Sequence, residues 1–307
     1  MNIQQLEYIV AVEKFRHFAK AASYCNVTQP TLSMMIHKLE EELNIEIFDR
    51  TKSPVEVNPV GDAIIKQAKR VLLDLAIVKE IAEDSKSSIS GELRFSIIPT
   101  IAPYLLPQMF KKLKQYLPDL HCTVSEMRTQ VVIDKLKRAE IDLAIVSTPL
   151  NDPQILELPL YYERFLVYVS SDEELHKKEF VEGSDLIIDK LWILEEGHCF
   201  RAQTLNICNN KRTFQQYEAG SIDNLVKVVD LNGGYTLIPE LHFDCLSELQ
   251  KKNVRKFSGA EPRREVSLIF RQDFYREKLL NEILRCVKEI IPEGMMDKRL
   301  SKFRIKL

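Results

Sequence analysis

Residues 17–51 read HFAKAASYCNVTQPTLSMMIHKLEEELNIEIFDRT, and this stretch predicts two helices joined by a tight turn. The first helix carries small alanines, which let a second helix cross it closely. Thr28 is a good N-cap for the second helix, and Pro30 falls in its first turn, where the missing N–H costs nothing. An ordinary helical hairpin shares each single feature, but the whole pattern indicates a helix-turn-helix whose second helix enters the major groove of DNA. Apolar residues at helical spacing predict the inward face of that helix: Leu32, Ile36, Leu39 and Leu43.

The same stretch resembles the N-terminal domain of LysR-type transcriptional regulators. Ala-x-Ala-Ala, Val-Thr-Gln-Pro-Thr-Leu-Ser, Leu-Glu-Glu-Glu-Leu and Phe-Asp-Arg-Thr follow one another in the order and spacing of that family. The resemblance implies a winged helix-turn-helix on a double-stranded DNA operator, with residues 51–59 as the wing and 55–57 as its strand. It also implies RNA polymerase as a partner at activated promoters. The expected DNA-binding residues are Gln29, Pro30, Thr31 and Ser33 at base edges, Arg50 at phosphate, and Lys38.

Charge and composition narrow the class of protein. Residues 1–60 hold six Lys or Arg against eight Asp or Glu, so we expect modest non-specific affinity, with specificity resting on base contacts and paired half-sites. The 307 residues leave room for two or three domains. With no run of 18 apolar residues and no signal-peptide pattern, we expect a cytoplasmic protein without a membrane segment. Six cysteines in a reducing compartment do not predict a structural disulfide framework.

A long helix is predicted after the wing. Its apolar residues recur at alternating steps of four and three positions, the spacing of a coiled-coil seam. The helix links two domains and has no obvious partner within the chain, so we favour a homodimer over packing on its own domain. Polar, glycine-terminated residues 84–91 predict a hinge. The expected seam is Ile64, Ala68, Val71, Leu75, Val78 and Ala82.

From residue 92 onward, apolar strands alternate with helices, which predicts parallel α/β sheets. The resemblance implies an effector domain of two Rossmann-like halves, similar to a periplasmic binding protein, with the signal sensed between the halves. The basic tail is expected to be a solvated end. The predicted domains are 1–60, 61–91, 92–295 (halves 92–164 plus 267–295, and 165–266) and 296–307. The predicted strands are 93–98, 121–126, 141–146, 165–169, 235–238 and 266–270, and the predicted helices are 104–116, 131–138, 199–207, a helix opening at Ser221, and 275–291.

Residues 195–201, Glu-Glu-Gly-His-Cys-Phe-Arg, suggest what is sensed. A cysteine at a helix N-terminus has its thiolate stabilised by unpaired N–H groups and the helix dipole, and His198 and Arg201 would add donors and positive charge. A thiolate attacks peroxide to give a sulfenic acid, which condenses with a second thiol. Cys199 and Cys208 could instead be small buried hydrophobic residues. The block resembles the peroxide-sensing members of the LysR family. This resemblance implies that Cys199 is the peroxidatic cysteine and Cys208 the resolving cysteine, and that the oxidised regulator activates antioxidant genes.

Other positions follow from the same resemblance. Pro-Thr-Ile-Ala-Pro-Tyr-Leu-Leu-Pro at residues 99–107 puts the Thr100 hydroxyl at a strand-to-helix turn, and Thr129 falls at the next such turn. Two hydroxyls and an imidazole are suitable partners for a peroxide that must be held in line and protonated as it leaves. Both threonines could instead be helix caps, although we favour the peroxide role for Thr100, and Arg271 could be in a surface ion pair. The expected peroxide pocket is Thr100, Thr129, His198, Arg201 and Arg271.

The spacing of the two cysteines predicts a conformational switch. Nine helical residues separate their Cα atoms by about 13.5 Å, whereas a disulfide needs them within about 7 Å. The helix must therefore unwind when the bond forms, which should change how effector domains pair, in a homodimer or, as the family implies, a homotetramer. A thiol reductant would reverse the change.

Three alternatives remain open at this stage. The cleft of a LysR-type regulator could bind a small organic effector, with the cysteines incidental. A thiol peroxidase is disfavoured because the chain carries a DNA-binding domain and no second catalytic cluster, so we expect no enzyme. A zinc site at His198, Cys199 and Cys208 lacks a fourth ligand at normal spacing, so we expect neither a metal nor a cofactor.

Overall fold

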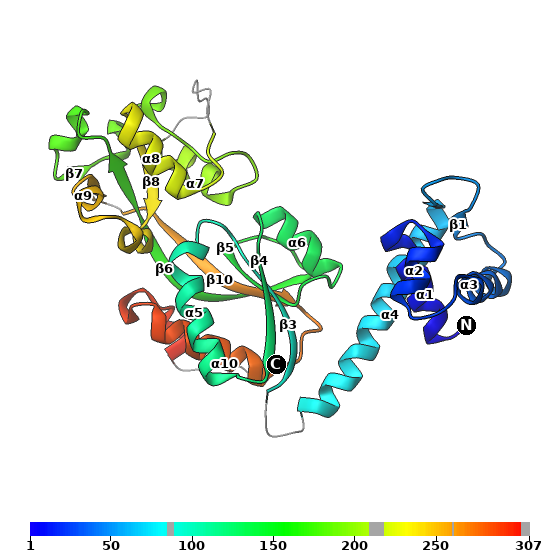
Figure 1. The fold of residues 1–307 in the computed structure, drawn as a ribbon. Coiled ribbons are helices and arrows are strands. Elements are labelled where there is room, and N and C mark those ends of the chain that lie inside the picture. The colour runs from blue at the N-terminus through cyan, green and yellow to red at the C-terminus, as the bar shows by residue number, and fades with distance from the viewer. Residues whose placement is uncertain (85–88, 209–217, 260, 302–307) are drawn as a thin grey trace. The chain divides into compact units, whose positions relative to one another are not determined.

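The computed structural model describes residues 1–84, 89–208, 218–259 and 261–301. The chain forms two compact units, Met1–Ser87 and Ser88–Leu307 (Figure 1). The first unit is helical with a small hairpin, and the second is built on a mixed β-sheet.

The first unit is a winged helix-turn-helix, as predicted. Ala21 and Ala22 are buried, which lets α2 and α3 approach closely. The Thr28 side chain accepts a hydrogen bond from the backbone N–H of Thr31 and so caps α3, with Pro30 in the first turn. The two short strands pair antiparallel and form the base of the wing. The elements are α1 (Ile3–Phe15), α2 (Phe18–Tyr24), α3 (Gln29–Leu43), β1 (Phe48–Asp49), β2 (Glu56–Val57) and α4 (Pro59–Asp84).

Helix α4 corrects one prediction about the coiled-coil seam. Its N-terminal half packs on α1: Ala68 is 2 % exposed in the core of the first unit, and Ile64 and Val71 pack against that core. The expectation that this helix lacks a partner within the chain is therefore wrong for this half, because its own domain already covers the apolar stripe. Further along, Leu75 is half-buried and Val78 is 64 % exposed. The Ala82 side chain and residues 85–88 of the predicted hinge lie outside the described residues.

The sheet of the second unit is mixed, which corrects the prediction of parallel α/β sheets. Strands β3, β4 and β5 are parallel, but β10 runs antiparallel to both β5 and β6, and β6 runs antiparallel to β8 and β9. The strand order is β4-β3-β5-β10-β6-β9-β7, with β8 also pairing with β6. The strands are β3 (Gly91–Ile97), β4 (Leu120–Glu126), β5 (Leu143–Thr148), β6 (Ile155–Val169), β7 (Phe180–Val181), β8 (Tyr235–Pro239), β9 (Val254–Phe257) and β10 (Arg263–Arg271).

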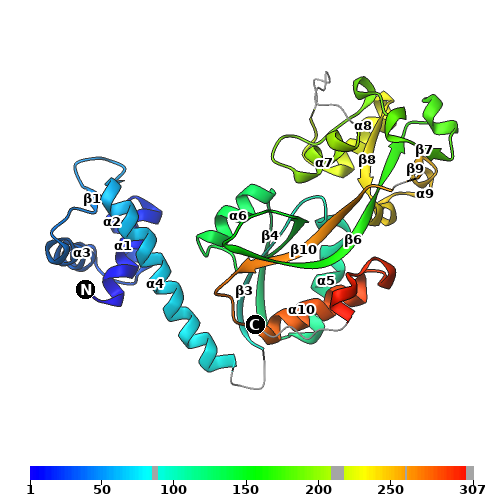
Figure 2. The ribbon, with the colours of Figure 1, turned by 180° about the vertical axis from the view of Figure 1, so that it is seen from behind.

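Two hydrophobic cores divide the second unit into halves. One core draws on residues 93–161 and 266–300, and the other on residues 165–257. Strands β6 and β10 lie side by side and run through both halves, and α5 packs against α10 in the first half (Figures 1 and 2). The helices are α5 (Ala102–Tyr116), α6 (Thr129–Lys137), α7 (Cys199–Ile207), α8 (Ile222–Asn232), α9 (Glu248–Lys251) and α10 (Glu277–Ile290).

Strand β6 has 15 residues, three times as many as the five-residue strand predicted at 165–169. Its first ten residues include Pro159 and the charged Glu157 and Glu163, which break the apolar run that the prediction relied on. The likeness to a periplasmic binding protein stays a prediction.

The C-terminal segment also departs from expectation. Leu300 is 4 % exposed within the first core of the second unit, and the Asp297 N–H donates to the carbonyl of Leu160 (2.9 Å). The Asp297 carboxylate in turn accepts from the Arg299 guanidinium (2.7 Å). These contacts attach the segment to the domain up to residue 301, so it is not a free end, although the basic Lys298 and Arg299 are exposed as predicted; residues 302–307 lie outside the described residues.

Candidate functional site

The two cysteines occupy opposite ends of helix α7, as the sequence predicts. Cys199 is the first residue of the helix and Cys208 is its C-cap. The half-buried Cys199 packs against the core of the first half, whereas Cys208 is 6 % exposed and belongs to the core of the second half. Burial raises the pKa of the Cys208 thiol to about 11. The pair therefore lies in two different environments, and both thiols are free.

The charges beside Cys199 differ from those that the sequence predicts. The His198 side chain is 3 % exposed, and its burial, together with the Arg128 charge, lowers the pKa of the imidazole. His198 is therefore neutral near pH 7 and adds no positive charge, so that part of the expectation is wrong. The Arg201 guanidinium donates to the carbonyl of Leu194 (2.8 Å) and to the Glu218 carboxylate (2.5 Å), which compensates its charge.

Arg264 is a buried cation at this site that sequence reasoning missed. Its Nη1 donates to Thr100 Oγ1 (2.9 Å), its Nε donates to Glu163 (2.8 Å), and its guanidinium lies over the Phe200 ring. Burial alone would lower the pKa of Arg264, but the Glu163 charge, with smaller contributions from neighbours that include Cys199, raises it above its usual value. Arg264 thus keeps its charge in the interior, connects Thr100 to α7, and interacts electrostatically with Cys199.

Tyrosines complete the network around Glu163. Tyr104 donates to Glu163 Oε1 (2.7 Å) and lies 2.9 Å from the Tyr161 hydroxyl. Burial raises the pKa of both tyrosines well above the usual value, so both remain protonated donors. Arg264 and Glu163, at 2 % and 0 % exposure, form a buried ion pair whose remaining hydrogen-bonding positions are largely filled.

Two buried polar atoms beside α7 have no hydrogen-bond partner within the described part of the chain: Thr129 Oγ1 and Gln203 Oε1. Thr129 opens α6, and Gln203 lies one turn after Cys199, on the same face of α7. Gln203 Nε2 donates to Ser147 Oγ (3.0 Å) on β5. Spacing of four residues from a reactive cysteine on a helix was the one signal in the sequence that could have identified Gln203.

An ion pair holds the N-terminal ends of α6 and α7 together across the two halves. Arg128, just before α6, pairs with Glu195, just before α7. A Cβ atom at Gly197 would lie 3.0 Å from Cδ of Arg128, and Gly197 also has a φ of +91°. Only glycine suits both the close approach and the left-handed backbone, which explains the glycine two residues before the cysteine.

Arg271 does not lie in this region, which corrects the predicted peroxide pocket. Because β10 runs antiparallel to β5, the end of β10 pairs with Leu143 at the start of β5. Arg271 therefore lies at the edge where the parallel strands begin, whereas Thr100 follows the edge where β3 ends. The Arg271 guanidinium donates to the carbonyl of Leu136, at the far end of α6 from Thr129 (3.3 Å). The arginine of β10 at the Thr100 edge is Arg264.

The predicted DNA-binding residues line the outer side of helix α3. Gln29, Pro30, Thr31 and Lys38 are exposed, and Ser33 is half-buried. Arg50 follows β1 and donates to both Ser33 Oγ (3.1 Å) and Glu40 Oε2 (2.7 Å). Ser33, which is expected at a base edge, and Arg50, which is expected at a phosphate, are therefore in contact with each other.

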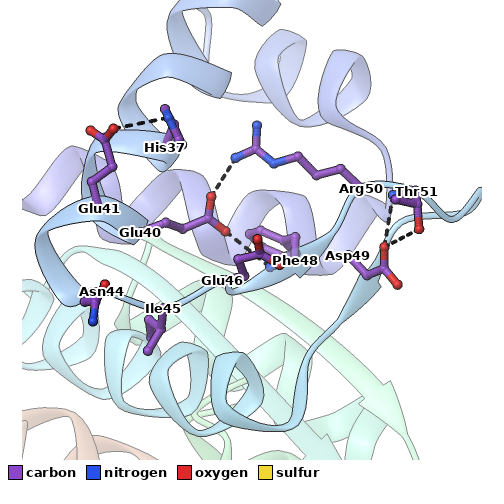
Figure 3. Close-up of a pocket in the computed structure, with 10 residues that line it drawn as sticks. All are labelled: His37, Glu40, Glu41, Asn44, Ile45, Glu46, Phe48, Asp49, Arg50 and Thr51. Atoms are coloured by element: carbon purple, nitrogen blue, oxygen red, sulfur yellow. Dashed lines mark hydrogen bonds and ion pairs between the residues drawn. The ribbon is translucent and has the colours of Figure 1, made fainter.

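A pocket of about 580 Å³ lies between the C-terminal half of α3 and the start of the wing (Figure 3). Four carboxylates against one arginine make it an unfavourable place for a DNA phosphate. The pocket thus lies at the acidic C-terminal end of α3. The predicted base-reading residues are at the other, N-terminal end of this helix. Its lining residues are His37, Glu40, Glu41, Asn44, Ile45, Glu46, Phe48, Asp49, Arg50 and Thr51.

Two features are absent from the described residues. No helix among them is long and apolar enough to cross a membrane. No three His, Cys, Asp or Glu side chains within the described ranges gather as a metal-binding group.

A winged helix-turn-helix unit followed by a two-core α/β unit defines a class of bacterial transcription regulators. Residues 3–62 match the model for the bacterial regulatory helix-turn-helix protein of the lysR family, and residues 86–291 match the LysR substrate binding domain. The chain belongs to the LysR family of transcriptional regulators.

Similar proteins include several named for hydrogen peroxide. The hydrogen peroxide-inducible genes activator of Haemophilus influenzae is 34% identical over 275 residues, covering 88% of this chain and 91% of that protein. A full-length OxyR variant from Pseudomonas aeruginosa has a TM-score of 0.81 at 31% identity, covering 97% and 98% of the two chains. A Corynebacterium glutamicum OxyR mutant with hydrogen peroxide bound has a TM-score of 0.62 at 27% identity, covering 94% and 92%.

Proposed function

We propose that this protein is a transcription regulator that responds to hydrogen peroxide through oxidation of Cys199. The observation that carries the proposal is the set of groups around helix α7. The buried Arg264 cation lies over Phe200, next to Cys199. Two buried polar atoms, Thr129 Oγ1 and Gln203 Oε1, have no hydrogen-bond partner among the described residues. The similar proteins named for hydrogen peroxide support the same signal.

Hydrogen peroxide suits these partners because each of its oxygens both donates and accepts hydrogen bonds. Gln203 Oε1 can accept from one peroxide hydroxyl, and the Thr129 hydroxyl can donate to the other oxygen. Filling both positions removes the cost of leaving buried polar atoms unpaired, which is about 1–3 kcal/mol for each group. A bulky organic effector would instead have to displace the hydrogen bonds from Arg264 to Thr100 and from Gln203 to Ser147.

The reaction proceeds in two balanced steps. The Cys199 thiolate attacks one peroxide oxygen, the O–O bond breaks, and the leaving hydroxide takes a proton to become water, which leaves a sulfenic acid on Cys199. The Cys208 sulfur then attacks Cys199 Sγ, and a second water leaves as the disulfide forms. Arg264 supplies a buried positive charge near Cys199, and neutral His198 can hydrogen-bond to the peroxide. Arg201, held by Glu218, keeps a structural role.

The second step requires helix α7 to unwind. Its nine residues separate the cysteines by about 13.5 Å, and their side chains pack on different cores. Oxidation therefore selects a second packing of α7, which changes the pairing of effector domains in a homodimer or homotetramer. That change moves the recognition helices on operator DNA, alters contact with RNA polymerase, and is reversed in the cytoplasm by a thiol reductant.

We assign DNA reading to the exposed N-terminal part of α3, with Gln29, Pro30, Thr31 and Ser33 at base edges and Lys38 at the backbone. The C-terminal half of α4, with Val78 exposed, is the part of the predicted seam left for contact between two copies of the chain.

The test uses two cysteine variants treated with stoichiometric peroxide. Cys199→Ser should abolish the disulfide, whereas Cys208→Ser should accumulate a sulfenic acid on Cys199 that a dimedone probe traps. Cys245→Ser is the matched control, because Cys245 is exposed in the same half, and it should behave as wild type. Footprinting of wild-type protein should then show a change in protected length on oxidation. A wild-type protein that forms no Cys199–Cys208 bond would point to the organic-effector alternative.

A further inference from the structure

Arg50 bridges two residues of the recognition helix. One guanidinium nitrogen donates to Ser33 Oγ (3.1 Å) and another to Glu40 Oε2 (2.7 Å), two turns further along α3. The guanidinium carbon also lies 5.0 Å from the centre of the Phe18 ring at the start of α2. Three side chains on two helices, α3 and α2, thus fix the orientation of a side chain that remains 38 % exposed.

Glu40 anchors this bridge to the backbone. It is 7 % exposed, and its Oε1 accepts a hydrogen bond from the N–H group of Ile47 (2.8 Å). The same oxygen accepts from the N–H group of Phe48 (3.3 Å; Figure 3). Its other oxygen is the one bound to Arg50. The carboxylate therefore has both oxygens occupied and cannot rotate without losing a buried hydrogen bond, which makes Arg50 a rigid donor toward Ser33.

The direction of the Arg50–Ser33 hydrogen bond has a chemical consequence. A serine hydroxyl can donate or accept, but a guanidinium can only donate. Because Arg50 occupies a lone pair of Ser33 Oγ, the serine proton is left to point toward a second acceptor. We propose that Glu40 and Arg50 are positioning residues that set Ser33 as a hydrogen-bond donor to a base acceptor in the major groove: purine N7, guanine O6 or thymine O4. This inference rests on the proposal that α3 reads DNA.

The proposal separates Arg50 from a simple phosphate contact. A phosphate needs positive charge, which lysine also provides, so a lysine at this position would preserve such a contact. The bridge needs two nitrogens in one plane that reach Ser33 and Glu40 together, which lysine does not offer. Arg50→Lys should therefore keep most of the electrostatic affinity and lose discrimination at the one base that Ser33 contacts.

The experiment uses the full-length protein and a duplex that the wild type selects from a random pool. Single acceptors are deleted with 7-deazapurines for N7, 2-aminopurine for guanine O6 and 5-methyl-2-pyrimidinone for thymine O4, and single phosphates with methylphosphonates. We expect one acceptor deletion to weaken wild-type binding by about three- to tenfold, the effect of one hydrogen bond. Ser33→Ala and Arg50→Lys should bind the unmodified duplex more weakly and show no further loss at that acceptor.

Lys52→Ala is the matched control, because Lys52 is a wing cation paired with Glu56, outside the bridge. It should weaken all duplexes alike and keep the full sensitivity to the acceptor deletion. Circular dichroism melts establish that each variant is folded, and Arg50→Lys tests the bridge without removing the buried Glu40 carboxylate. The proposal is overturned if Ser33→Ala or Arg50→Lys remains as sensitive as wild type, or if Ser33 sensitivity follows a methylphosphonate instead of a base. Failure of the wild type to select any duplex would refute the DNA-reading proposal itself.

Discussion

The two ends of helix α7 differ in almost every respect that governs thiol chemistry. At the N-terminal end, Cys199 is half-buried, packs on the first core of the second unit and interacts with the Arg264 cation. At the C-terminal end, Cys208 is buried in the second core, and burial raises the pKa of its thiol to about 11. One short helix thus joins two thiols in different environments. Under the proposed function, this difference sets the order of oxidation: Cys199 reacts first, and Cys208 follows only after α7 opens.

The largest expected effect comes from removing the cation at the Cys199 end. Arg264→Met leaves Glu163 buried without its ionic partner, so we expect the free energy of unfolding to fall by about 3–5 kcal/mol. Oxidation of Cys199 should slow by roughly tenfold, equivalent to about 1.4 kcal/mol of lost electrostatic stabilisation. Urea denaturation and the rate of dimedone trapping after peroxide addition measure the two effects.

The double variant Arg264→Met with Glu163→Gln separates stability from reactivity. It removes both charges together, so most of the lost stability should return while oxidation stays slow. A double variant that oxidises at the wild-type rate would show that the Arg264 charge has no part in the reaction.

The next effect tests the protected end of the helix. With a pKa of about 11, the Cys208 thiol is almost fully protonated at pH 8, so iodoacetamide should label it about two orders of magnitude more slowly than an ordinary thiol. Mass spectrometry of the reduced protein over time gives the rate, and exposed Cys245 is the internal control. Equal labelling of both cysteines at pH 8 would mean that the second end of α7 is open without oxidation.

The same shift predicts how stability changes with pH. The folded-state pKa of Cys208 lies above 9.0, the usual value for a thiol. Folding therefore favours the protonated thiol, and this stabilisation is present below pH 9 and lost as the pH rises from 9 toward 11. Cys208→Ser should flatten the fall in stability across that range.

Local signals explain which parts of the fold could be predicted from the sequence. The cap at Thr28, the proline at position 30 and the apolar spacing that follows lie within one helix, and they gave α3 correctly. The bounds of α7 also followed from local signals, since Gly197 and Cys199 mark its start. Such features depend on neighbours a few residues away, which a sequence displays directly.

The errors arose where structure depends on distant partners. The direction of β10 is set by its pairing with β5 and β6, so the sequence could not tell which end of the strand meets Thr100, and it predicted Arg271 for the pocket. Nothing in the sequence indicated the ion pair between Glu163 and Arg264, because no local signal shows that residues 101 positions apart meet in the interior. The spacing of Ile64, Ala68 and Val71 fits both a partner helix and the protein's own core, and only the tertiary contacts distinguish them.

The smallest expected effect sharpens the description of the reactive end. Thr129→Val replaces a buried hydroxyl that has no hydrogen-bond partner within the described ranges with a methyl group of similar shape. Stability should therefore stay within about 1 kcal/mol of wild type, or rise slightly, because no hydrogen bond is lost. Oxidation of Cys199 should nevertheless slow by about three- to tenfold, since the hydroxyl is the donor proposed for peroxide.

Thr100→Val is the contrasting variant. The Thr100 hydroxyl accepts from Arg264, so its loss should reduce the free energy of unfolding by about 1–3 kcal/mol and also slow oxidation. Thermal melts and dimedone trapping on both variants measure the difference. A Thr129→Val protein that is clearly destabilised yet oxidises at the wild-type rate would make Thr129 a structural residue and place the peroxide elsewhere along α7.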